Sequence, residues 1–214
     1  MRVRVPPPAP FSIPGLTAAA MTANLRDKWD ARYRTASPTD ARAAQVLTDN
    51  LHLLPTKGRG LDLAAGLGGN AYVLGRHGIT TEAWDLSPVG SRLIESYAHT
   101  TGLPVIARVR DVIAQPPETD TFDVIVVSAF LHRPLCDAIA SALRPGGLLF
   151  YQTYCQTRVS TGGPSNPDFL LADGELLQLF PGLKPIVYRE EGTLGDPFVG
   201  FRDRAMLVAE RRSG

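Results

Sequence analysis

A glycine-dense turn between an apolar run and a helix-compatible segment constrains this chain more than any other feature. Residues 59–70 read Arg-Gly-Leu-Asp-Leu-Ala-Ala-Gly-Leu-Gly-Gly-Asn, and a helix-compatible segment follows as far as His77. Glycines allow the backbone to approach a ligand closely, and a helix N-terminus offers free N–H groups. The stretch therefore predicts a strand, a ligand-binding loop and a helix.

An acidic residue at the end of the next apolar segment supports this interpretation. Residues 79–85 read as a strand that ends in Asp85, which lies 19 residues after Gly66. A spacing of about 20 residues places a carboxylate on the ribose diol of a bound nucleoside. The glycine loop and the acid together indicate a cofactor that contains adenosine.

The pattern Gly66-x-Gly68-x-x-Ala71 fits the dinucleotide fingerprint, so an NAD site is one alternative. Asp62 argues against it, because an acid near the first glycine would face an anionic pyrophosphate at the helix N-terminus. S-adenosylmethionine has an ammonium and a sulfonium and no phosphate, so the same acid would favour it. Asp62 has a second interpretation as a carboxylate that caps the loop by accepting backbone N–H groups.

These residues resemble the class I S-adenosylmethionine-dependent methyltransferases, and more narrowly the small bacterial enzymes of the tellurite-resistance and thiopurine group. The resemblance extends over about residues 25–210. It rests on Leu61-Asp62-Leu63-Ala64-Ala65-Gly66-Leu67-Gly68-Gly69-Asn70, Trp84-Asp85-Leu86-Ser87-Pro88, Arg110-Asp111-Val112, Phe122-Asp123-Val124-Ile125-Val126-Val127-Ser128, Leu143-Arg144-Pro145-Gly146-Gly147 and Trp29-Asp30-x-Arg32-Tyr33. The family's usual cysteine in the first motif is Ala65 here, where only a small side chain is needed.

The resemblance implies S-adenosyl-L-methionine as the cofactor and a set of residues that contact it: Asp62, Ala64, Gly66, Gly68, Asn70, Asp85, Leu86, Asp111, Val112, Ser128, Trp29 and Tyr33. Asp111 is expected at the adenine edge, with a turn-forming aspartate as the alternative. Trp29 and Tyr33 share one helical face, where they either cover the cofactor or fix the helix to the core.

The acceptor side is expected where the fourth strand ends, because ligands bind at the switch point of an open α/β sheet. Ser128 and Phe130 would line the methyl channel, His132 would act as a base and Arg133 would hold an anionic acceptor. The alternative is that His132 caps the next helix and Arg133 is a solvated surface charge. A soft anion such as tellurite or selenite, or a thiol, needs no base, whereas an oxygen or nitrogen acceptor would use His132.

Alternating strand and helix signals predict an α/β, doubly wound, Rossmann-like and mostly parallel sheet of seven strands, with an antiparallel C-terminal strand. Residues 21–214 are expected to form a single methyltransferase domain, and the proline-rich residues 1–20 a disordered tail. Helices are predicted over 24–34, 39–53, 70–77, 88–101, 135–143 and 172–180, and strands over 59–64, 79–85, 104–110, 122–128, 148–154, 184–190 and 203–210.

Charge and cysteine content limit the classes of partner. The chain of 214 residues carries a net charge of +1, so neither a nucleic acid nor a membrane is expected as a partner. Two cysteines suit a reducing cytoplasm. No spacing typical of metal ligands appears, and the chain is expected to be a monomer or homodimer that meets a small-molecule acceptor.

Two other functions remain open from the residues. A catalytically silent regulatory protein that binds S-adenosylmethionine would keep the glycine loop and Asp85 without an acceptor pocket. An NAD-linked oxidoreductase would use the same loop for a dinucleotide, although its substrate site often needs additional chain.

Overall fold

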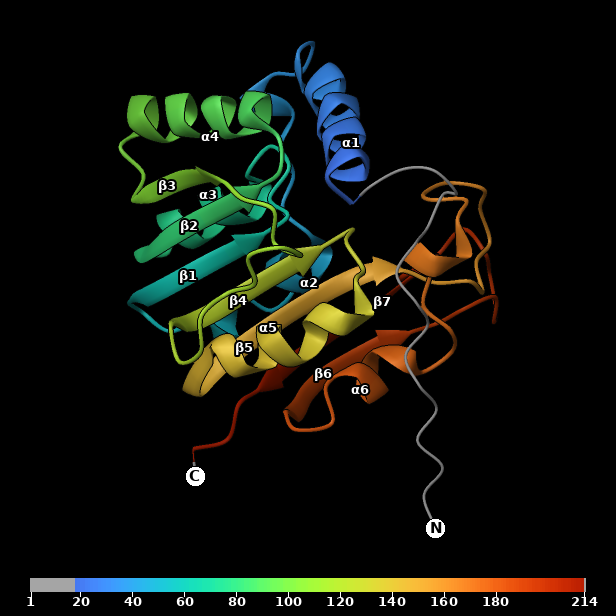
Figure 1. Ribbon diagram of the computed structural model, residues 1–214. Helices are drawn as coiled ribbons and strands as arrows, with labels where there is room; N and C mark the ends of the chain where they lie inside the picture. The colour runs from blue at the N-terminus through green and yellow to red at the C-terminus, as the bar shows by residue number, and fades with distance from the viewer. Residues whose placement is uncertain (1–17, 214) are drawn as a thin grey trace.

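The structure is a computed structural model that describes residues 18–213. Its centre is a seven-stranded sheet with the strand order β3-β2-β1-β4-β5-β7-β6 (Figure 1). The predicted α/β fold and its seven strands are thereby confirmed. The strands are β1 (Gly58–Leu63), β2 (Ile79–Asp85), β3 (Val105–Val109), β4 (Phe122–Ser128), β5 (Leu143–Tyr154), β6 (Lys184–Glu190) and β7 (Arg204–Glu210).

The order of the strands reverses between β1 and β4. Both pair in parallel, and from them the chain runs outward to β2 and β3 on one side and to β5 on the other. Such a reversal opens a crevice at the carboxyl ends of the two central strands. The last strand is antiparallel, as predicted, and it lies between β5 and β6.

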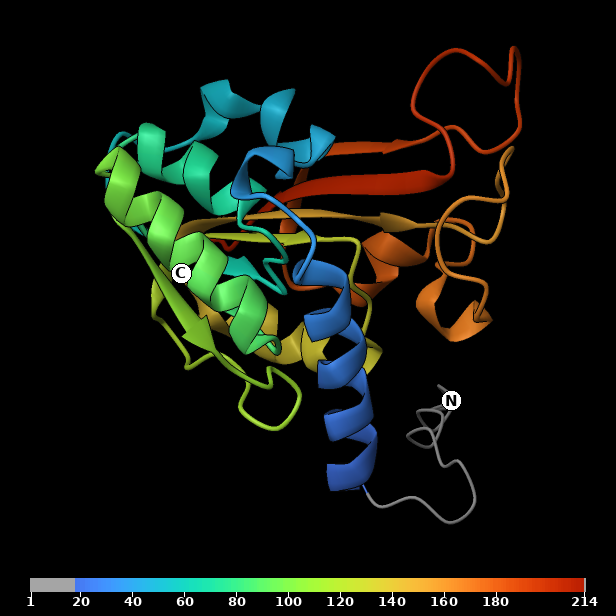
Figure 2. The same cartoon turned by 90° about the horizontal axis from the view of Figure 1, so that it is seen from above.

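Helices cover both faces of the sheet (Figures 1 and 2). One face carries α2 (Gln45–Thr48), α3 (Gly69–Arg76) and α4 (Pro88–Thr101), and the other carries α5 (Cys136–Ala142) and α6 (Glu175–Leu179). Along β4 the side chains of Val124 and Val126 pack on the first face, and those of Ile125 and Val127 on the second. Burial on both faces explains why this strand is a continuous apolar run.

Helix α1 (Ala18–Tyr33) lies at the edge where the central strands end, and its N-terminal half extends beyond the sheet (Figure 2). It begins earlier than the predicted helix over 24–34, because residues 18–20 are alanines, the strongest helix formers. The remainder of the predicted tail, residues 1–17, lies outside the described residues.

The single helix predicted over 39–53 is instead three short pieces: η1 (Pro38–Asp40), α2 and η2 (Leu51–Leu53). Ser37 caps the first piece. Contacts with the rest of the protein separate the pieces, since the N–H groups of Ala44 and Val46 donate to the side chains of Asn70 and Gln152. Two further 3-10 turns, η3 (Arg133–Leu135) and η4 (Pro167–Phe169), lie near the carboxyl edge.

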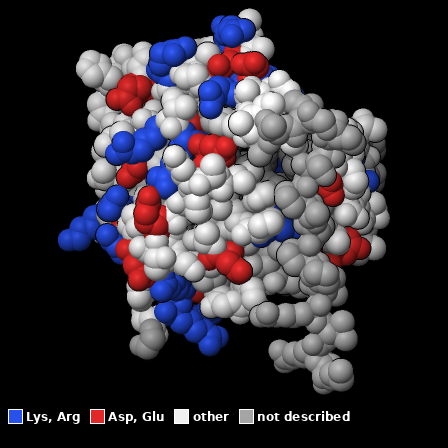
Figure 3. All heavy atoms as spheres, in the orientation of Figure 1, with Lys and Arg blue, Asp and Glu red and all other residues white. Residues whose placement is uncertain are grey.

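The surface in Figure 3 shows basic and acidic side chains interspersed over the face seen there. The predicted partners of the chain are not tested by this view and remain predictions. Among the helices of residues 18–213, none has both the length and the apolar character that crossing a bilayer requires.

Candidate functional site

In the glycine loop after β1, every second residue from Ala64 to Gly68 has an unusual backbone conformation. Ala64, Gly66 and Gly68 have φ values of 57°, 61° and 82°. Glycine adopts this left-handed region freely, whereas alanine pays about 1–2 kcal/mol for it. Backbone strain held at a residue other than glycine is typical of functional sites. The predicted loop residues therefore lie together at the carboxyl end of β1.

Asp62 lies beneath this loop and has no exposed surface. Its carboxylate accepts from the Ala71 N–H at 3.0 Å and from the Asn70 side chain at 3.1 Å. Burial raises the pKa of Asp62 to about 7, against the effect of those two hydrogen bonds. A fully buried carboxylate that caps α3 matches the second interpretation of Asp62, and its predicted contact with the cofactor stays a prediction.

Asn70 is also buried and joins three parts of the chain. Its amide nitrogen donates to Asp62 and, at 3.0 Å, to the Ser128 hydroxyl, and its oxygen accepts from the Ala44 N–H at 2.8 Å. With all these partners inside the protein, the predicted cofactor contact of Asn70 is replaced by a positioning role. It holds the end of β4 and the segment before α2 against the glycine loop.

Asp85 ends β2 and faces the same loop. One carboxylate oxygen accepts from the Gly66 N–H at 2.8 Å, and the other accepts from the Ser87 N–H at 2.9 Å. Burial raises the pKa of Asp85, while these N–H groups oppose the increase and the nearby charge of Asp30 adds to it. A carboxylate can accept about four hydrogen bonds, and the Leu86 N–H also acts on this one, so an acceptor position remains for a hydroxyl of a diol. This is the geometry that the spacing predicted.

Helix α1 packs over this region through Asp30 and Tyr33. The Ser87 hydroxyl and, at 3.3 Å, the Val89 N–H donate to the Asp30 carboxylate. Tyr33 is buried, stacks on Trp29 with ring centroids 5.7 Å apart, and lies so close to Gly90 that a side chain there would meet its ring at 2.9 Å. These contacts show that Tyr33 fixes the helix to the core, and the role of the aromatic pair in covering the cofactor stays a prediction.

The predicted adenine edge follows β3. Asp111 accepts from the N–H groups of Ile113 and Ala114 through one oxygen, and from the Thr22 hydroxyl of α1 at 3.3 Å through the other. Asp111 thus forms the turn that was the alternative interpretation. The Val112 side chain packs in the core and is 6% exposed, so its predicted cofactor contact, which stays a prediction, would be made by its backbone. Leu86 is half-buried beside Asp85.

The charged groups around the glycine loop fit a cationic cofactor better than a dinucleotide. Asp85 borders the loop and Asp30 lies close to Asp85, and two neighbouring carboxylates attract an ammonium or a sulfonium. The Ala71 N–H at the start of α3, which a pyrophosphate would need, already donates to Asp62. Among residues 18–213, no group of three or more His, Cys, Asp or Glu side chains could hold a metal.

At the end of β4, Ser128 is half-buried and Ala129 has a φ of 52°. Phe130 packs partly against the core. Partial burial lowers the pKa of His132, and the charge of Asp111 opposes this effect. The imidazole is therefore neutral at neutral pH and can accept a proton. Its own side chain does not cap the following turn.

Arg133 differs from its predicted role. Its guanidinium donates to both carboxylate oxygens of Glu175, at 2.6 and 2.9 Å, and to the carbonyls of Asp168 and Leu170. The pKa of Arg133 is raised chiefly by this pairing with Glu175. A guanidinium that is already neutralised has no charge left for an acceptor, so Arg133 joins the end of β4 to the segment before α6.

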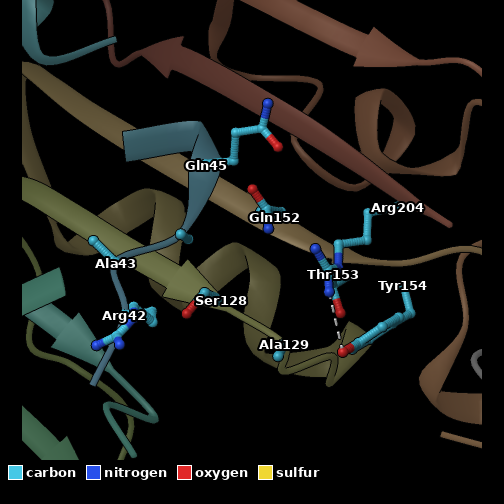
Figure 4. A pocket seen from close by; sticks show the side chains of 10 residues that line it. Arg42, Ala43, Gln45, Ser128, Ala129, Gln152, Thr153, Tyr154 and Arg204 are labelled. Atoms are coloured by element: carbon cyan, nitrogen blue, oxygen red, sulfur yellow. Dashed lines mark hydrogen bonds between the residues drawn. The ribbon is translucent and has the colours of Figure 1, made fainter. Parts of the chain in front are cut away.

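A cavity of about 300 Å³ lies beside Ser128 at the carboxyl ends of β4 and β5 (Figure 4). We call it the β4–β5 cavity, and it is lined by Arg42, Ala43, Ala44, Gln45, Ser128, Ala129, Gln152, Thr153, Tyr154 and Arg204. Gln152 is buried, and its side-chain oxygen accepts from the Val46 N–H at 2.8 Å.

Sequence reasoning missed several of these residues. Arg42 and Arg204 come from segments outside every motif. Strand pairing with Tyr154 brings Arg204 to the cavity, and the close approach of its loop to Gly69 brings Arg42 there. Gly69 was within reach, because two adjacent glycines suggest a close backbone approach: a side chain at this position would collide with the carbonyl group of Arg42.

Comparison with known proteins agrees with this geometry. Residues 32–185 match the sequence model of a protein family that is described as a methyltransferase domain. No curated protein matches the chain.

Solved structures share the fold at low sequence identity. TehB from Haemophilus influenzae superposes with a TM-score of 0.63 at 19% identity, over 87% of this chain and 67% of that one. The structure described as the conversion of a disulfide bond into a thioacetal group during echinomycin biosynthesis superposes with a TM-score of 0.65 at 20% sequence identity. The match covers 88% of this chain and 92% of that one. A putative sarcosine dimethylglycine methyltransferase from Galdieria sulphuraria superposes with a TM-score of 0.59 at 17% sequence identity. The match covers 78% of this chain and 84% of that one.

Proposed function

Because the chain belongs to the methyltransferase domain family and is an S-adenosylmethionine-dependent methyltransferase, we propose that its methyl acceptor is a small molecule. The β4–β5 cavity carries this proposal. Its volume of about 300 Å³ is at the lower end of the range for sites that hold small ligands.

The residues that would hold the cofactor are Asp85, Gly66 and Gly68, with Tyr33 of α1 above them and Asp111 at the far end of the site. When bound, S-adenosylmethionine supplies a methyl group on a sulfonium, so the acceptor's lone pair forms the new bond and the electrons of the broken C–S bond remain with S-adenosylhomocysteine. The protein supplies proximity, alignment and exclusion of water.

On the acceptor side, Ser128 lies between the glycine loop and the cavity, since Asn70 of α3 donates to its hydroxyl. The neutral His132 is the nearest predicted base, and it would take the proton of an oxygen or nitrogen acceptor. A thiolate, or a soft oxyanion such as tellurite or selenite, would need no such step. The acceptors that this proposal favours are therefore soft nucleophiles, as the resemblance to the tellurite-resistance and thiopurine group implies.

Calorimetric titration tests the cofactor site. S-adenosylhomocysteine should bind the wild-type protein, and Asp85→Asn should weaken binding by about tenfold or more, because the loss of a charged acceptor to a hydroxyl costs roughly 1.5–3 kcal/mol. NADH should not bind. Circular dichroism of Asp85→Asn serves as the folding control, because Asp85 also accepts from Gly66 and Ser87.

The acceptor class is tested by the release of S-adenosylhomocysteine in the presence of single candidates. The panel contains thiophenol, 4-mercaptobenzoate, tellurite and selenite, beside transfer RNA and casein as macromolecular acceptors. Turnover with a small molecule and none with a macromolecule is expected. Turnover confined to transfer RNA or casein would overturn the proposal.

A further inference from the structure

The β4–β5 cavity is lined by two arginines and by no acidic residue. The Arg204 guanidinium lies 5.0 Å from the centre of the Tyr154 ring and 3.5 Å from its hydroxyl. Within residues 18–213, it forms no ion pair. The nearby carboxylate of Asp203 feels the charge of Arg204, but it accepts hydrogen bonds from Val159 and Ser160 and does not line the cavity. The guanidinium therefore meets no carboxylate on the cavity side, and the site is suited to receive an anion.

Other arginines near the same edge of the sheet have carboxylate partners. Arg133 pairs with Glu175, and Arg189 and Arg202 share Glu191. Arg189 also repeats the stacking of Arg204, since its guanidinium lies 5.7 Å from the Phe201 ring centre. Arg158 forms no ion pair within residues 18–213 either, but it donates to the carbonyls of Gly162 and Pro164 and does not line the cavity. Arg204 is therefore the arginine at the ends of β5–β7 that combines a place in the cavity lining with the lack of an ion pair among the described residues.

The second arginine adds positive potential from the opposite side. Arg42 folds back on its own loop, where it donates to the carbonyls of Thr39 and Ala41 and to no carboxylate. Figure 4 shows Arg42 and Ala43 on one side of the cavity, Tyr154 and Arg204 on the other, and Gln152 between them. An anion at Arg204 would thus meet two basic side chains and no acidic one in the cavity lining, with hydroxyl and amide groups available for hydrogen bonds.

We propose that the β4–β5 cavity selects an organic acceptor with an anionic group, such as a carboxylate, which Arg204 binds while a second atom of the same molecule is presented beside Ser128 for methylation. The inference rests on the proposed function and adds the chemical class of the acceptor to it.

The spacing of the strands explains why the acceptor is organic. Ser128 of β4 pairs with Gln152 of β5, and Tyr154, two residues further along β5, pairs with Arg204 of β7. Two strand spacings and a step of two residues along β5 separate the backbones of Ser128 and Arg204 by about 12 Å. An oxyanion with a single central atom is too small to lie at both places. A molecule with a nucleophilic atom at one end and a carboxylate at the other can do so.

The test uses two probes of equal size, 4-mercaptobenzoate and 4-mercaptobenzamide, titrated into the protein saturated with S-adenosylhomocysteine. The carboxylate probe should bind the wild type at least about tenfold more tightly than the amide, as expected for a charge-assisted hydrogen bond. Arg204→Gln should remove this preference, and Arg204→Lys should retain part of it. The matched control, Arg189→Gln, removes the same charge from the neighbouring strand and should leave the preference unchanged.

Three outcomes would overturn the inference: equal affinity for both probes, no binding of either probe, or a preference that survives in Arg204→Gln. Unchanged affinity for S-adenosylhomocysteine shows that each variant is folded. The proposed function fails separately, if no small molecule in the panel is methylated. Turnover of thiophenol without any carboxylate preference would keep the proposed function and reject the role of Arg204.

Discussion

Asp62 and Asp85 both lie beside the glycine loop, yet their surroundings give them different roles. Asp62 has no exposed surface and both of its oxygens accept from α3, whereas Asp85 is 7% exposed and holds the loop from the other side. Residue type alone does not separate these roles. Access to the surface and the number of free acceptor positions do.

The raised pKa of Asp62 predicts how stability depends on pH. The native side chain titrates at about 7, whereas the unfolded chain titrates near 3.9. Between these values the native state keeps a proton that the unfolded state has lost, so this contribution to stability is complete below about pH 4 and is lost as the pH rises through 7. We expect the unfolding free energy of the wild type minus that of Asp62→Asn to fall by roughly 2–4 kcal/mol across that range.

Urea unfolding of both proteins at a series of pH values measures this difference. Taking the difference cancels the contributions of the other carboxyl groups, several of which have lowered pKa values and so an opposite slope, such as Glu82 and Glu175. A difference that stays level or increases with pH would show that Asp62 remains ionised in the native state.

At the scale of elements, the segment before α2 forms one wall of the β4–β5 cavity, although it has little regular structure. Its position depends on close backbone contact with the glycine loop, and on the hydrogen bonds from Ala44 to Asn70 and from Val46 to Gln152. The conformation of such an irregular segment is determined by the residues that it contacts, not by the secondary-structure propensity of its own sequence.

Substitution of Gly69 tests this contact. In Gly69→Ala the new methyl group would collide with the Arg42 carbonyl, and overpacking of this kind costs about 1–3 kcal/mol. We expect that loss in urea unfolding, together with weaker binding of 4-mercaptobenzoate. Gly182→Ala is the matched control, since open space surrounds that position, and its change should stay within about 0.5 kcal/mol. Equal losses of stability in both variants would show that the contact between Gly69 and the Arg42 carbonyl does not hold this segment in place.

The ion pair of Arg133 and Glu175 links the end of β4 to α6. The two side chains are 26% and 19% exposed, so their charges are screened less than those of a surface pair. A double-mutant cycle with Arg133→Gln and Glu175→Gln should give a coupling energy of about 1–2 kcal/mol. The more exposed pair of Lys184 and Glu210 should give less than about 1 kcal/mol in the same measurement.

Methyl transfer by the same variants separates a structural role from an acceptor-binding role for Arg133. If the ion pair only positions the end of β4, Arg133→Gln and Glu175→Gln should change the KM for the acceptor to a similar extent. A large increase in KM for Arg133→Gln alone would restore the acceptor role that the sequence suggested.

At the scale of the whole molecule, α1 spans the site from one end to the other. Thr22 donates to Asp111 near its N-terminus, and Asp30 and Tyr33 contact the region of Ser87 and the glycine loop near its C-terminus. Much of the helix is otherwise exposed, and α4 is the element that it chiefly contacts. A helix with few buried contacts opens easily, so a ligand beneath it should stabilise it.

Hydrogen exchange measures this coupling. Saturation with S-adenosylhomocysteine should slow the exchange of amides in residues 22–33 by about tenfold or more, because a bound ligand adds contacts under α1 and disfavours its opening. Amides of α5, which packs on the opposite face of the sheet, should change much less. Protection that is equal in α1 and α5 would indicate global stabilisation and would contradict a covering role for α1.

Local signals were sufficient for much of the fold. The glycine loop between β1 and α3, the start of α4 at Ser87 and Pro88, and the buried strand β4 all appear where the sequence predicts them. Each depends on neighbours in the chain: left-handed conformations favour glycine, a serine caps the helix that follows it, and a strand covered on both faces is apolar throughout.

The roles of individual side chains in the site required the tertiary structure. The burial of Asp62 under α3 leaves no trace in the local pattern, and Arg133 was assigned to the acceptor because its partner Glu175 lies 42 residues away. Insertion of β7 between β5 and β6 brings Arg204 beside Tyr154. The sequence by itself thus determined the fold class and the cofactor, which follow from short-range patterns. The order of the strands, the cavity and its basic lining were decided only when distant segments packed together.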